Sequence, residues 1–416
     1  MAVKTDIRNS LIYMTPIVVN TIIPLITIPI FTRILTQNDY GLLALATIYA
    51  TLFNGLANLG LPAIFERSYF EFQNDLKKLS QLFFSSMVFV ILNFIFLLSL
   101  TYVFKNKISL ILTGSPDNSI FICITMIAHF FYATINNFYF NYYKNSKESG
   151  TFTKFRILNS IIYFITSIYF VVFLRIGLLG IVLAQLFAGL LVFAVLFYQI
   201  LKKLKFSFNK EILFNSLKIG YPLVPRLFIG VINSQFDKYM IGHFIGLGNV
   251  GVYHIGKMIA EQGYTFMYAL QNVFNPEVYK RMFEGDKNQN SIGEYLTPFF
   301  YISIFVVLTI SLFSKEIIIL VAPKNYHGAT PIISTLSIYF GFLFFNKLVG
   351  TQLLFKKKSH MNSLLTLISV ILNVILNIPL IISYGAFGAA IATSMAGLIS
   401  GLISLCVAQY YFKINY

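Results

Sequence analysis

The chain has 416 residues, of which 57% are hydrophobic and 11% charged, and its mean hydropathy is +0.75. Soluble domains carry roughly 25% charged residues, so this composition excludes a soluble globular protein and indicates a polytopic membrane protein. The formal net charge is +16. We attribute this charge to membrane topology and to attraction by anionic lipid head groups rather than to nucleic-acid binding.

The apolar residues form twelve runs long enough to cross a membrane as helices. About 20 helical residues, rising 1.5 Å each, span the roughly 30 Å hydrocarbon layer. The sequence therefore predicts an all-α fold with twelve transmembrane helices, at residues 10–32, 40–65, 80–104, 118–141, 154–174, 178–201, 218–241, 250–275, 296–321, 328–354, 360–383 and 386–411.

An internal repeat relates the two halves of the chain. The pattern that begins at Gly177 recurs at Gly385, an offset of 385 − 177 = 208, and the motif at Gly41 recurs at Gly251, an offset of 251 − 41 = 210. Each half holds six predicted spans, so both halves enter the membrane from the same side as parallel repeats. We expect two six-helix bundles, residues 1–205 and 206–416.

The distribution of basic residues predicts the orientation. With the N-terminus inside, 21 of the 31 lysines and arginines lie on the cytoplasmic side, whereas the opposite loops hold Arg33, Lys105, Lys107, Arg175, Lys315 and Lys324. Because cytoplasmic loops of membrane proteins carry the excess of positive charge, we expect both termini in the cytoplasm.

Several function classes find no support in the sequence. The loops are too short for a soluble catalytic domain, no Gly-x-x-x-x-Gly-Lys-Ser/Thr nucleotide motif occurs, and the five histidines lack metal-ligand spacing. The two cysteines, Cys123 and Cys406, lie in apolar spans and suit packing rather than a disulfide framework. We therefore expect no enzyme activity and no cofactor.

The seventh predicted span carries a line of polar residues. Arg226, Asn233 and Asp237 fall within about 20° of one helix face. Charges within a span cost about 2.5–3.5 kcal/mol each on insertion scales, so each requires a partner or a wet cavity. Pro222 and Pro225 should interrupt the helix at its entry, and broken helices are typical of transporters.

The eighth predicted span has a longer polar stripe. It contains Lys257, Glu261, Tyr264, Tyr268 and Gln271, all within about 40° of one line. Lys257 and Glu261 have the i, i+4 spacing of an ion pair, which either merely lowers the cost of insertion or serves a cavity.

Milder polar positions occur elsewhere in the spans. They suit either helix-packing hydrogen bonds or ligand contacts, and they are Asn20, Asn54, Asn58, Asn136, Asn137, Asn141, Asn373 and Asn377. Lys347 either extends its ammonium to the cytoplasmic face or serves a cavity.

Four segments carry a resemblance to a known family. They are IPIFTRILTQNDYG at 28–41, FDKYMIG at 236–242 followed by NVGVY at 249–253, NVILNIPLI at 373–381, and YGAFGAAIAT at 384–393. Each is loose alone, but their order and spacing resemble those of Wzx-type polysaccharide biosynthesis flippases, the O-antigen and capsule translocases of the multidrug/oligosaccharidyl-lipid/polysaccharide exporter superfamily.

The resemblance implies two helical bundles facing each other in a V and opening alternately to either side of the bacterial cytoplasmic (inner) membrane. It implies undecaprenyl-pyrophosphate-linked oligosaccharide repeat units as cargo, and a polysaccharide polymerase and a chain-length regulator as further partners besides the lipid bilayer. It also implies basic residues in the cavity. We expect Arg226, Asn233, Lys257, Tyr264, Tyr268 and Lys347 to bind substrate, and Glu261 and Asp237 to couple transport to an ion.

Three rival functions remain open. A multidrug exporter of the same superfamily should favour an acidic cavity for organic cations, whereas the basic residues of these spans lean toward an anionic cargo. A polysaccharide polymerase or ligase should have a large outer loop, and the predicted outer loops are short. A flippase of the peptidoglycan precursor would differ mainly in the head group that it binds.

Overall fold

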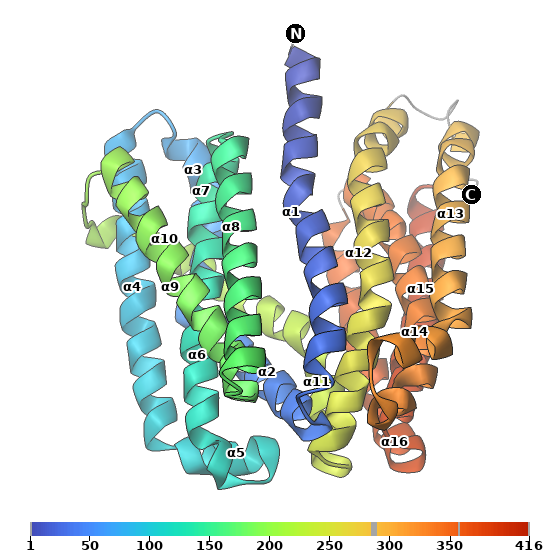
Figure 1. Ribbon diagram of the computed structural model, residues 1–416. Helices are drawn as coiled ribbons and strands as arrows, with labels where there is room; N and C mark the ends of the chain where they lie inside the picture. The colour runs from blue at the N-terminus through green and yellow to red at the C-terminus, as the bar shows by residue number, and fades with distance from the viewer. Residues whose placement is uncertain (1, 284–288, 357, 415–416) are drawn as a thin grey trace. The chain divides into compact units, whose positions relative to one another are not determined.

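The computed structural model describes residues 2–283, 289–356 and 358–414, and all regular structure within these ranges is helical (Figure 1). The prediction of an all-α membrane protein is confirmed. The chain forms two compact units, the first of Met1–Leu35 and Leu42–Val231, the second of Thr36–Gly41 and Ile232–Tyr416. Each unit is described by itself.

The first unit is a set of helices that contact partners both near and far along the chain. Helix α8 packs against α9 and α1, and α6 packs against α9, while α3, α4 and α10 contact one another. The helices are α1 (Ala2–Phe31), α2 (Gln37–Asn58), α3 (Leu61–Phe72), α4 (Leu76–Val103), α5 (Lys105–Thr113), α6 (Ser119–Thr134), α7 (Phe140–Asn145), α8 (Ser149–Ile168), α9 (Leu178–Lys203) and α10 (Lys210–Gly220).

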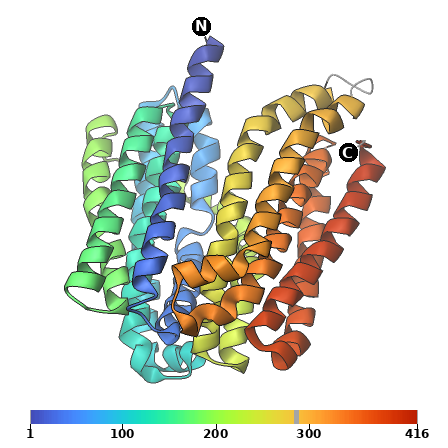
Figure 2. The same ribbon diagram turned by 45° about the vertical axis from the view of Figure 1, so that its right-hand side comes forward.

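The second unit is centred on one helix, which makes its most extensive contacts with three others. This helix, α15, packs against α16, α12 and α13, and Figure 2 shows α12 and α13 side by side in yellow and light orange. The helices are α11 (Val224–Phe244), whose first residues belong to the first unit, α12 (Leu247–Phe283), α13 (Gln289–Leu312), α14 (Ser314–Val321), α15 (Thr330–Phe355) and α16 (Ser359–Tyr411).

Each predicted span contains a helix, although within the described ranges eight helices are apolar enough to count as spans by length and composition alone. Helix α16 covers two predicted spans in one run, and Thr15–Phe31 is the apolar part of α1 whose side chains the structure describes. Helices α11 and α12 carry the charges at Asp237, Lys257 and Glu261, which lower their hydropathy. The charged residues expected to act in transport are therefore the same ones that keep α11 and α12 from being recognised as spans by hydropathy.

The boundary expected between residues 205 and 206 stays a prediction about the two bundles. By contacts alone, the first unit extends to Val231 and so includes α10, which packs against α3 and α4. As the prolines predicted, α10 does not continue into α11. A 3-10 turn, Tyr221–Leu223, separates them.

The two copies of one repeated motif contact each other within the second unit. A side chain at Gly41 would lie 2.0 Å from the carbonyl oxygen of Leu247, and a side chain at Gly251 would lie 2.0 Å from that of Gln37. Each glycine thus meets the backbone four residues before the other glycine. Only glycine permits such an approach of two helices.

The other repeated pattern gives two glycines the same unusual backbone conformation. Gly177 has φ 68° and ψ −142°, and Gly385 has φ 64° and ψ −145°. This region of φ and ψ is essentially restricted to glycine. Gly177 precedes α9, and Gly385 turns the chain inside α16, so the duplication extends from sequence to local geometry.

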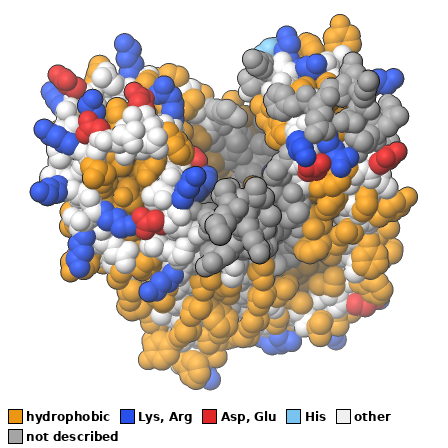
Figure 3. Space-filling model, turned by 90° about the horizontal axis from the view of Figure 1, so that it is seen from above, with side chains coloured by type: hydrophobic (Ala, Val, Ile, Leu, Met, Phe, Trp, Pro, Cys, Tyr) orange, Lys and Arg blue, Asp and Glu red, His pale blue; other side chains and the backbone are white. Residues whose placement is uncertain are grey.

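Positive charge gathers at one end of the first unit. Figure 3, a view from above Figure 1, shows many lysine and arginine side chains on this face. In the first unit, Lys77 and Lys78 at the start of α4 and Lys202 and Lys203 at the end of α9 are exposed. The orientation of this end in the membrane stays a prediction.

Candidate functional site

A buried ion pair joins α11 and α12. The Lys257 ammonium donates to Asp237 Oδ2 at 3.1 Å, and the two side chains are only 12% and 5% exposed. The ammonium also donates to the Ser234 carbonyl at 2.7 Å, and the Tyr253 hydroxyl donates to the same Asp237 oxygen. Charges removed from water remain stable only when paired and hydrogen-bonded in this way.

A second lysine completes this group. Lys238 is buried, and its ammonium donates to Gln235 Oε1 at 2.8 Å, while its backbone N–H donates to Asp237 Oδ1 at 2.8 Å. We call Asp237, Lys238, Tyr253 and Lys257 the ion cluster. It holds two ammonium groups and one carboxylate, and sequence reasoning missed the roles of Lys238 and Tyr253.

The predicted pairing of Lys257 with Glu261 is wrong for this structure. Among the described residues, the ion-pair partner of Lys257 is Asp237, and Glu261 is exposed. The physical reason is burial. A carboxylate in a low-dielectric surrounding gains far more from a nearby ammonium than an exposed carboxylate does.

Three predicted binding residues come together in the second unit. The Lys347 ammonium lies 4.5 Å from the ring centroid of Tyr268 and 5.4 Å from that of Tyr264. Tyr264 is in turn stacked on Phe340, with 5.4 Å between the ring centroids. Because an ammonium is attracted to aromatic faces within about 6 Å, the tyrosines hold this cation on α15 close to α12.

Lys347 lines a cavity of about 470 Å³ inside the second unit. We call it the C-terminal cavity. Its described lining includes this one cation and no carboxylate. The polar lining residues are Asn233, Tyr268, Gln271, Asn275, Tyr279, Tyr339, Asn346, Lys347, Thr351, Asn362, Thr366, Ser369, Ser400 and Ser404. The cavity therefore offers many neutral hydrogen-bonding groups and a single positive charge.

Two amide oxygens in this lining have no hydrogen-bond partner among the described residues. They are Gln271 Oε1 and Asn275 Oδ1, and the Gln271 side chain is only 3% exposed. Buried polar atoms are nearly always hydrogen-bonded. The cavity thus contains acceptors that water or a ligand's hydroxyl groups would satisfy.

The structure divides the predicted site residues into two groups. Asn233, Tyr268 and Lys347 line the C-terminal cavity, and Tyr264 adjoins it through Lys347. Asp237 and Lys257 instead belong to the ion cluster. Arg226 lies in α11, and its side chain is outside the described part of the structure.

Sequence reasoning missed most of the amide and hydroxyl groups of the cavity. On α16, Asn362, Thr366 and Ser369 recur at helical spacing, as do Ser400 and Ser404, and all of them line the cavity. This i, i+4, i+7 pattern of small polar residues in an apolar span is the signal that could have found them. For Asn346, the sequence signal is its position next to Lys347.

The fold and the cavity together define a class of protein. Apolar helices in two repeated halves, with a polar cavity inside one unit, characterise a multi-pass membrane protein of the transporter type. Over residues 7–276 the sequence matches the family described as polysaccharide biosynthesis protein. The chain belongs to this family.

Solved structures share the fold over nearly the whole chain. A multidrug resistance MATE family transporter of the MOP superfamily, solved in an inward-facing conformation, is 13% identical, covers 94% of this chain and 97% of its own, and gives a TM-score of 0.70. The lipid II flippase MurJ, in an inward closed conformation, is 17% identical, with coverage of 97% and 87% and a TM-score of 0.71.

A third similar structure is a MOP superfamily transporter from Pyrococcus furiosus, described as having a binding pocket of reverse polarity. It is 15% identical, with coverage of 97% of this chain and 94% of its own, and a TM-score of 0.61. No curated protein sequence matches this chain. The structural matches establish the MOP superfamily fold, and the family match establishes a connection to polysaccharide biosynthesis.

Proposed function

We propose that the protein flips undecaprenyl-pyrophosphate-linked oligosaccharide repeat units across the bacterial inner membrane by alternating access, for O-antigen or capsule biosynthesis. The observation that carries the proposal is the C-terminal cavity. It combines one ammonium with a dense set of amides and hydroxyls and has no carboxylate in its described lining.

The chemistry of such a cargo fits this lining. An oligosaccharide carries many hydroxyl groups, and exposing each to hydrocarbon costs several kcal/mol, so unassisted crossing is very slow. Amide and hydroxyl side chains such as those of Asn346, Asn362 and Ser400 replace the lost water. Tyr268 and Tyr339 can stack on sugar faces, and Lys347 supplies a positive charge for a phosphate or another anion.

The same lining argues against export of cationic drugs. An organic cation gains from a carboxylate in a cavity, and the described lining offers Lys347 instead. The similarity to the lipid II flippase MurJ is a reason to keep a peptidoglycan-precursor flippase as the second candidate. The two cargoes share a polyprenyl pyrophosphate and differ in the head group. Comparing the transport rates of the two cargoes therefore distinguishes the two candidate functions.

The ion cluster supports a proposal for energy coupling. Lys257 is bound to Asp237 on α11, and Glu261 lies one helical turn further along α12, within reach at i, i+4. We place the coupling in an exchange of Lys257 between these two carboxylates. A group with two alternative partners is the kind of element whose balance an ion or a bound anion can shift.

The remaining assignments follow from the same proposal. Both termini lie in the cytoplasm, Arg226 and Asn233 contribute to the binding of the head group, and a polymerase and a chain-length regulator receive the translocated units. Cysteine labelling of single-cysteine variants tests the orientation. Labelling of a cysteine at position Lys105 or Lys324 from the cytoplasmic side would show that the orientation is the opposite one.

Translocation itself is tested with purified protein in vesicles that contain a fluorescent lipid-linked repeat unit. Transfer between leaflets should exceed that in protein-free vesicles, and a lipid-linked peptidoglycan precursor should be transferred more slowly. In cells, removal of the protein should leave repeat units on the inner leaflet. Equal transfer with and without protein would contradict the proposal, and faster transfer of the precursor would favour the second candidate.

A further inference from the structure

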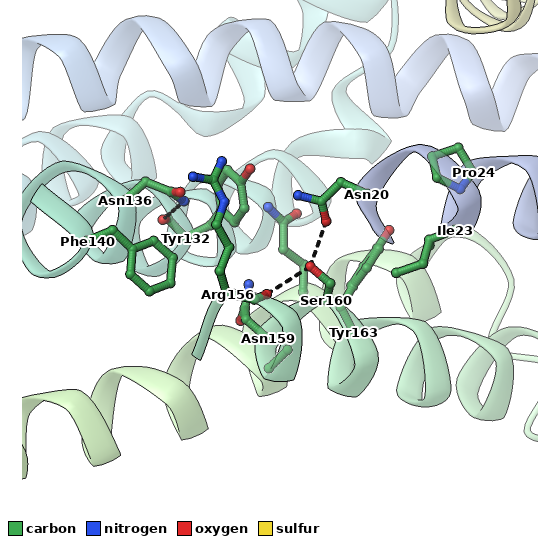
Figure 4. Close-up of a pocket in the computed structure, with 12 residues that line it drawn as sticks. Asn20, Ile23, Pro24, Tyr132, Asn136, Phe140, Arg156, Asn159, Ser160 and Tyr163 are labelled. Carbon is green, nitrogen blue, oxygen red and sulfur yellow. Dashed lines mark hydrogen bonds between the residues drawn. The ribbon is translucent and has the colours of Figure 1, made fainter. Parts of the chain in front are cut away.

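A second polar cavity lies inside the first unit. Its lining includes Asn20 and Asn136, two of the milder polar positions noted in the sequence, but none of the residues expected to bind substrate or to couple an ion. We call it the N-terminal cavity. It has a volume of about 360 Å³ and lies among α1, α6, α8 and α9 (Figure 4). Its polar lining residues are Asn20, Tyr132, Asn136, Arg156, Asn159, Ser160, Tyr163 and Gln185.

Arg156 is the cation of this cavity. It lies seven residues after the start of α8 at Ser149, roughly 10 Å along the helix. The predicted orientation counts Arg156 among the 21 basic residues on the cytoplasmic side. Figure 4 shows its side chain extending from α8 toward Tyr132 and Asn136. The guanidinium carbon is 5.4 Å from the Phe152 ring centroid and 5.9 Å from that of Phe140.

No carboxylate neutralises this guanidinium in the described structure. None of the described ion pairs includes Arg156, and the described lining of the cavity contains neither Asp nor Glu. The aromatic contacts stabilise its position without using its paired N–H donors. These donors remain suited to a planar or tetrahedral anion.

The neighbouring amides are partly engaged and partly open. Ser160 Oγ donates to Asn20 Oδ1 at 2.7 Å, and Asn136 Nδ2 donates to the Tyr132 carbonyl at 2.7 Å. Asn159 Oδ1, by contrast, is buried without a hydrogen-bond partner among the described residues. Asn136 lies in a π-helical turn, Ile135–Tyr139, a distortion frequently found at functional sites.

The internal repeat relates this cavity to the C-terminal one. The offset of 210 residues that relates Gly41 to Gly251 also relates three lining positions of one cavity to three of the other: Asn136 to Asn346, Arg156 to Thr366, and Asn159 to Ser369. The two cavities thus occupy corresponding places in the two repeats.

The cation differs between the corresponding cavities in type and in position. In the C-terminal cavity it is Lys347, beside Asn346 on α15, whereas in the N-terminal cavity it is Arg156 on α8, at the position that corresponds to Thr366. An ammonium is a compact point charge, and a guanidinium offers a rigid fork of donors. Duplication followed by such a change gives two polar pockets with different preferences for anions.

We propose that the N-terminal cavity is a second binding site, for an anionic group on a hydroxylated ligand, with Arg156 as its anion-binding residue. The inference rests on the proposed function only for the source of the anion. That source is either the pyrophosphate of the lipid carrier or the carboxylate of an acidic sugar, because guanidinium binds both with paired hydrogen bonds. Asn159 and Gln185 would contact neighbouring hydroxyl groups.

The experiment measures binding to the full-length protein in lipid nanodiscs. The probes are farnesyl pyrophosphate, a glucuronate-containing oligosaccharide and a neutral oligosaccharide of equal length. The wild type should bind at least one anionic probe more tightly than the neutral one, and Arg156→Ala should weaken that probe by about tenfold to hundredfold, the loss expected for a hydrogen bond to a charged group. Arg156→Lys should lie between them.

Matched variants separate the outcomes. Lys154→Ala, which changes an exposed cation two residues away on α8, should bind the two anionic probes as the wild type does. The proposal is overturned if the wild type binds no anionic probe, or if Arg156→Ala and Arg156→Lys, both folded by thermal unfolding, bind it unchanged.

The same preparations keep this inference distinct from the proposed function. If the wild type translocates lipid-linked repeat units but Arg156 variants bind and translocate normally, the flippase proposal stands and the second site fails. If no lipid-linked cargo moves but anion binding still depends on Arg156, the second site stands and the flippase proposal fails.

Discussion

The ion cluster and the C-terminal cavity are two polar regions of one helical unit, and they differ in how their polar groups are satisfied. In the ion cluster, Asp237, Lys238 and Lys257 each have hydrogen-bond partners in the protein. In the C-terminal cavity, Gln271 and Asn275 keep oxygen atoms without partners among the described residues.

This difference separates polar groups that hold helices together from polar groups that await a ligand. Closed networks of buried charges fix one arrangement of the helices that carry them. Open acceptors in a cavity have a cost that a bound ligand or water removes. Substitutions in the two regions should therefore have opposite signatures, with loss of stability in the cluster and loss of transport with retained stability in the cavity.

The largest effect on stability is expected for Asp237→Asn. It leaves the Lys257 ammonium without its carboxylate and weakens the acceptor of the Lys238 backbone N–H, and breaking a buried pair on one side costs about 3–5 kcal/mol. The unfolding free energy in detergent should fall accordingly. Combining Asp237→Asn with Lys257→Met should recover part of the loss.

An exposed ion pair provides the control for this substitution. Arg67 and Glu71 form a pair in α3 with side chains 65% and 56% exposed, so Glu71→Gln should cost less than about 1 kcal/mol. Equal unfolding free energies for Asp237→Asn and the wild type would show that the cluster does not stabilise the unit.

The next effect is a loss of transport in Lys347→Met. This substitution keeps most of the side-chain volume but removes the cation of the C-terminal cavity. A charge-assisted contact contributes about 1.5–3 kcal/mol, so translocation of lipid-linked repeat units should fall by roughly tenfold or more, with unfolding unchanged. Lys315→Met, on α14 and outside this lining, serves as the control, and equal rates for the two variants would contradict a role of Lys347 in binding.

The sequence predicted the helical architecture well because each apolar run must satisfy its backbone within the membrane as a helix. It also named Asn233, Tyr268 and Lys347 as expected binding residues, and that role stays a prediction. That these three residues, from α11, α12 and α15, line one cavity came from the structure alone. The repeat glycines could be found by pattern alone. Their contact, in which Gly41 meets Leu247 and Gly251 meets Gln37, needed the structure.

The partner of Lys257 could not be predicted in the same way. Spacing along one helix makes Glu261 the obvious partner, whereas Asp237 reaches Lys257 from another helix. The choice depends on burial, which only the three-dimensional arrangement of α11 and α12 decides. Arg156 was missed for a related reason, since a cation near a helix start is typical of the cytoplasmic side and only the structure shows the cavity beside it.

A smaller effect is expected where Tyr268 supports Lys347. Tyr268→Phe keeps an aromatic face 4.5 Å from the ammonium, whereas Tyr268→Ala removes it. Cation–π contacts contribute roughly 0.5–1 kcal/mol at exposed sites, so the alanine variant should bind the cargo about two- to fivefold more weakly than the phenylalanine variant. If both variants lose binding equally, the Tyr268 hydroxyl rather than its ring is what the cargo contacts.

The smallest effect on stability is expected for Glu261→Gln, which is also the sharpest test of how the two regions communicate. Glu261 is exposed, and Lys257 is already bound to Asp237, so neither folding nor cargo binding should change by more than about twofold, as for other exposed charges. If Lys257 exchanges between the two carboxylates, however, the variant leaves it only Asp237. Transport in vesicles should then lose its acceleration by an imposed proton or sodium gradient while its basal rate remains.

Glu277→Gln, which changes a carboxylate paired with Arg281 further along α12, should keep the full response. A Glu261→Gln protein that responds to the gradient as the wild type does would reduce the ion cluster to a structural role and leave translocation driven by consumption of the cargo.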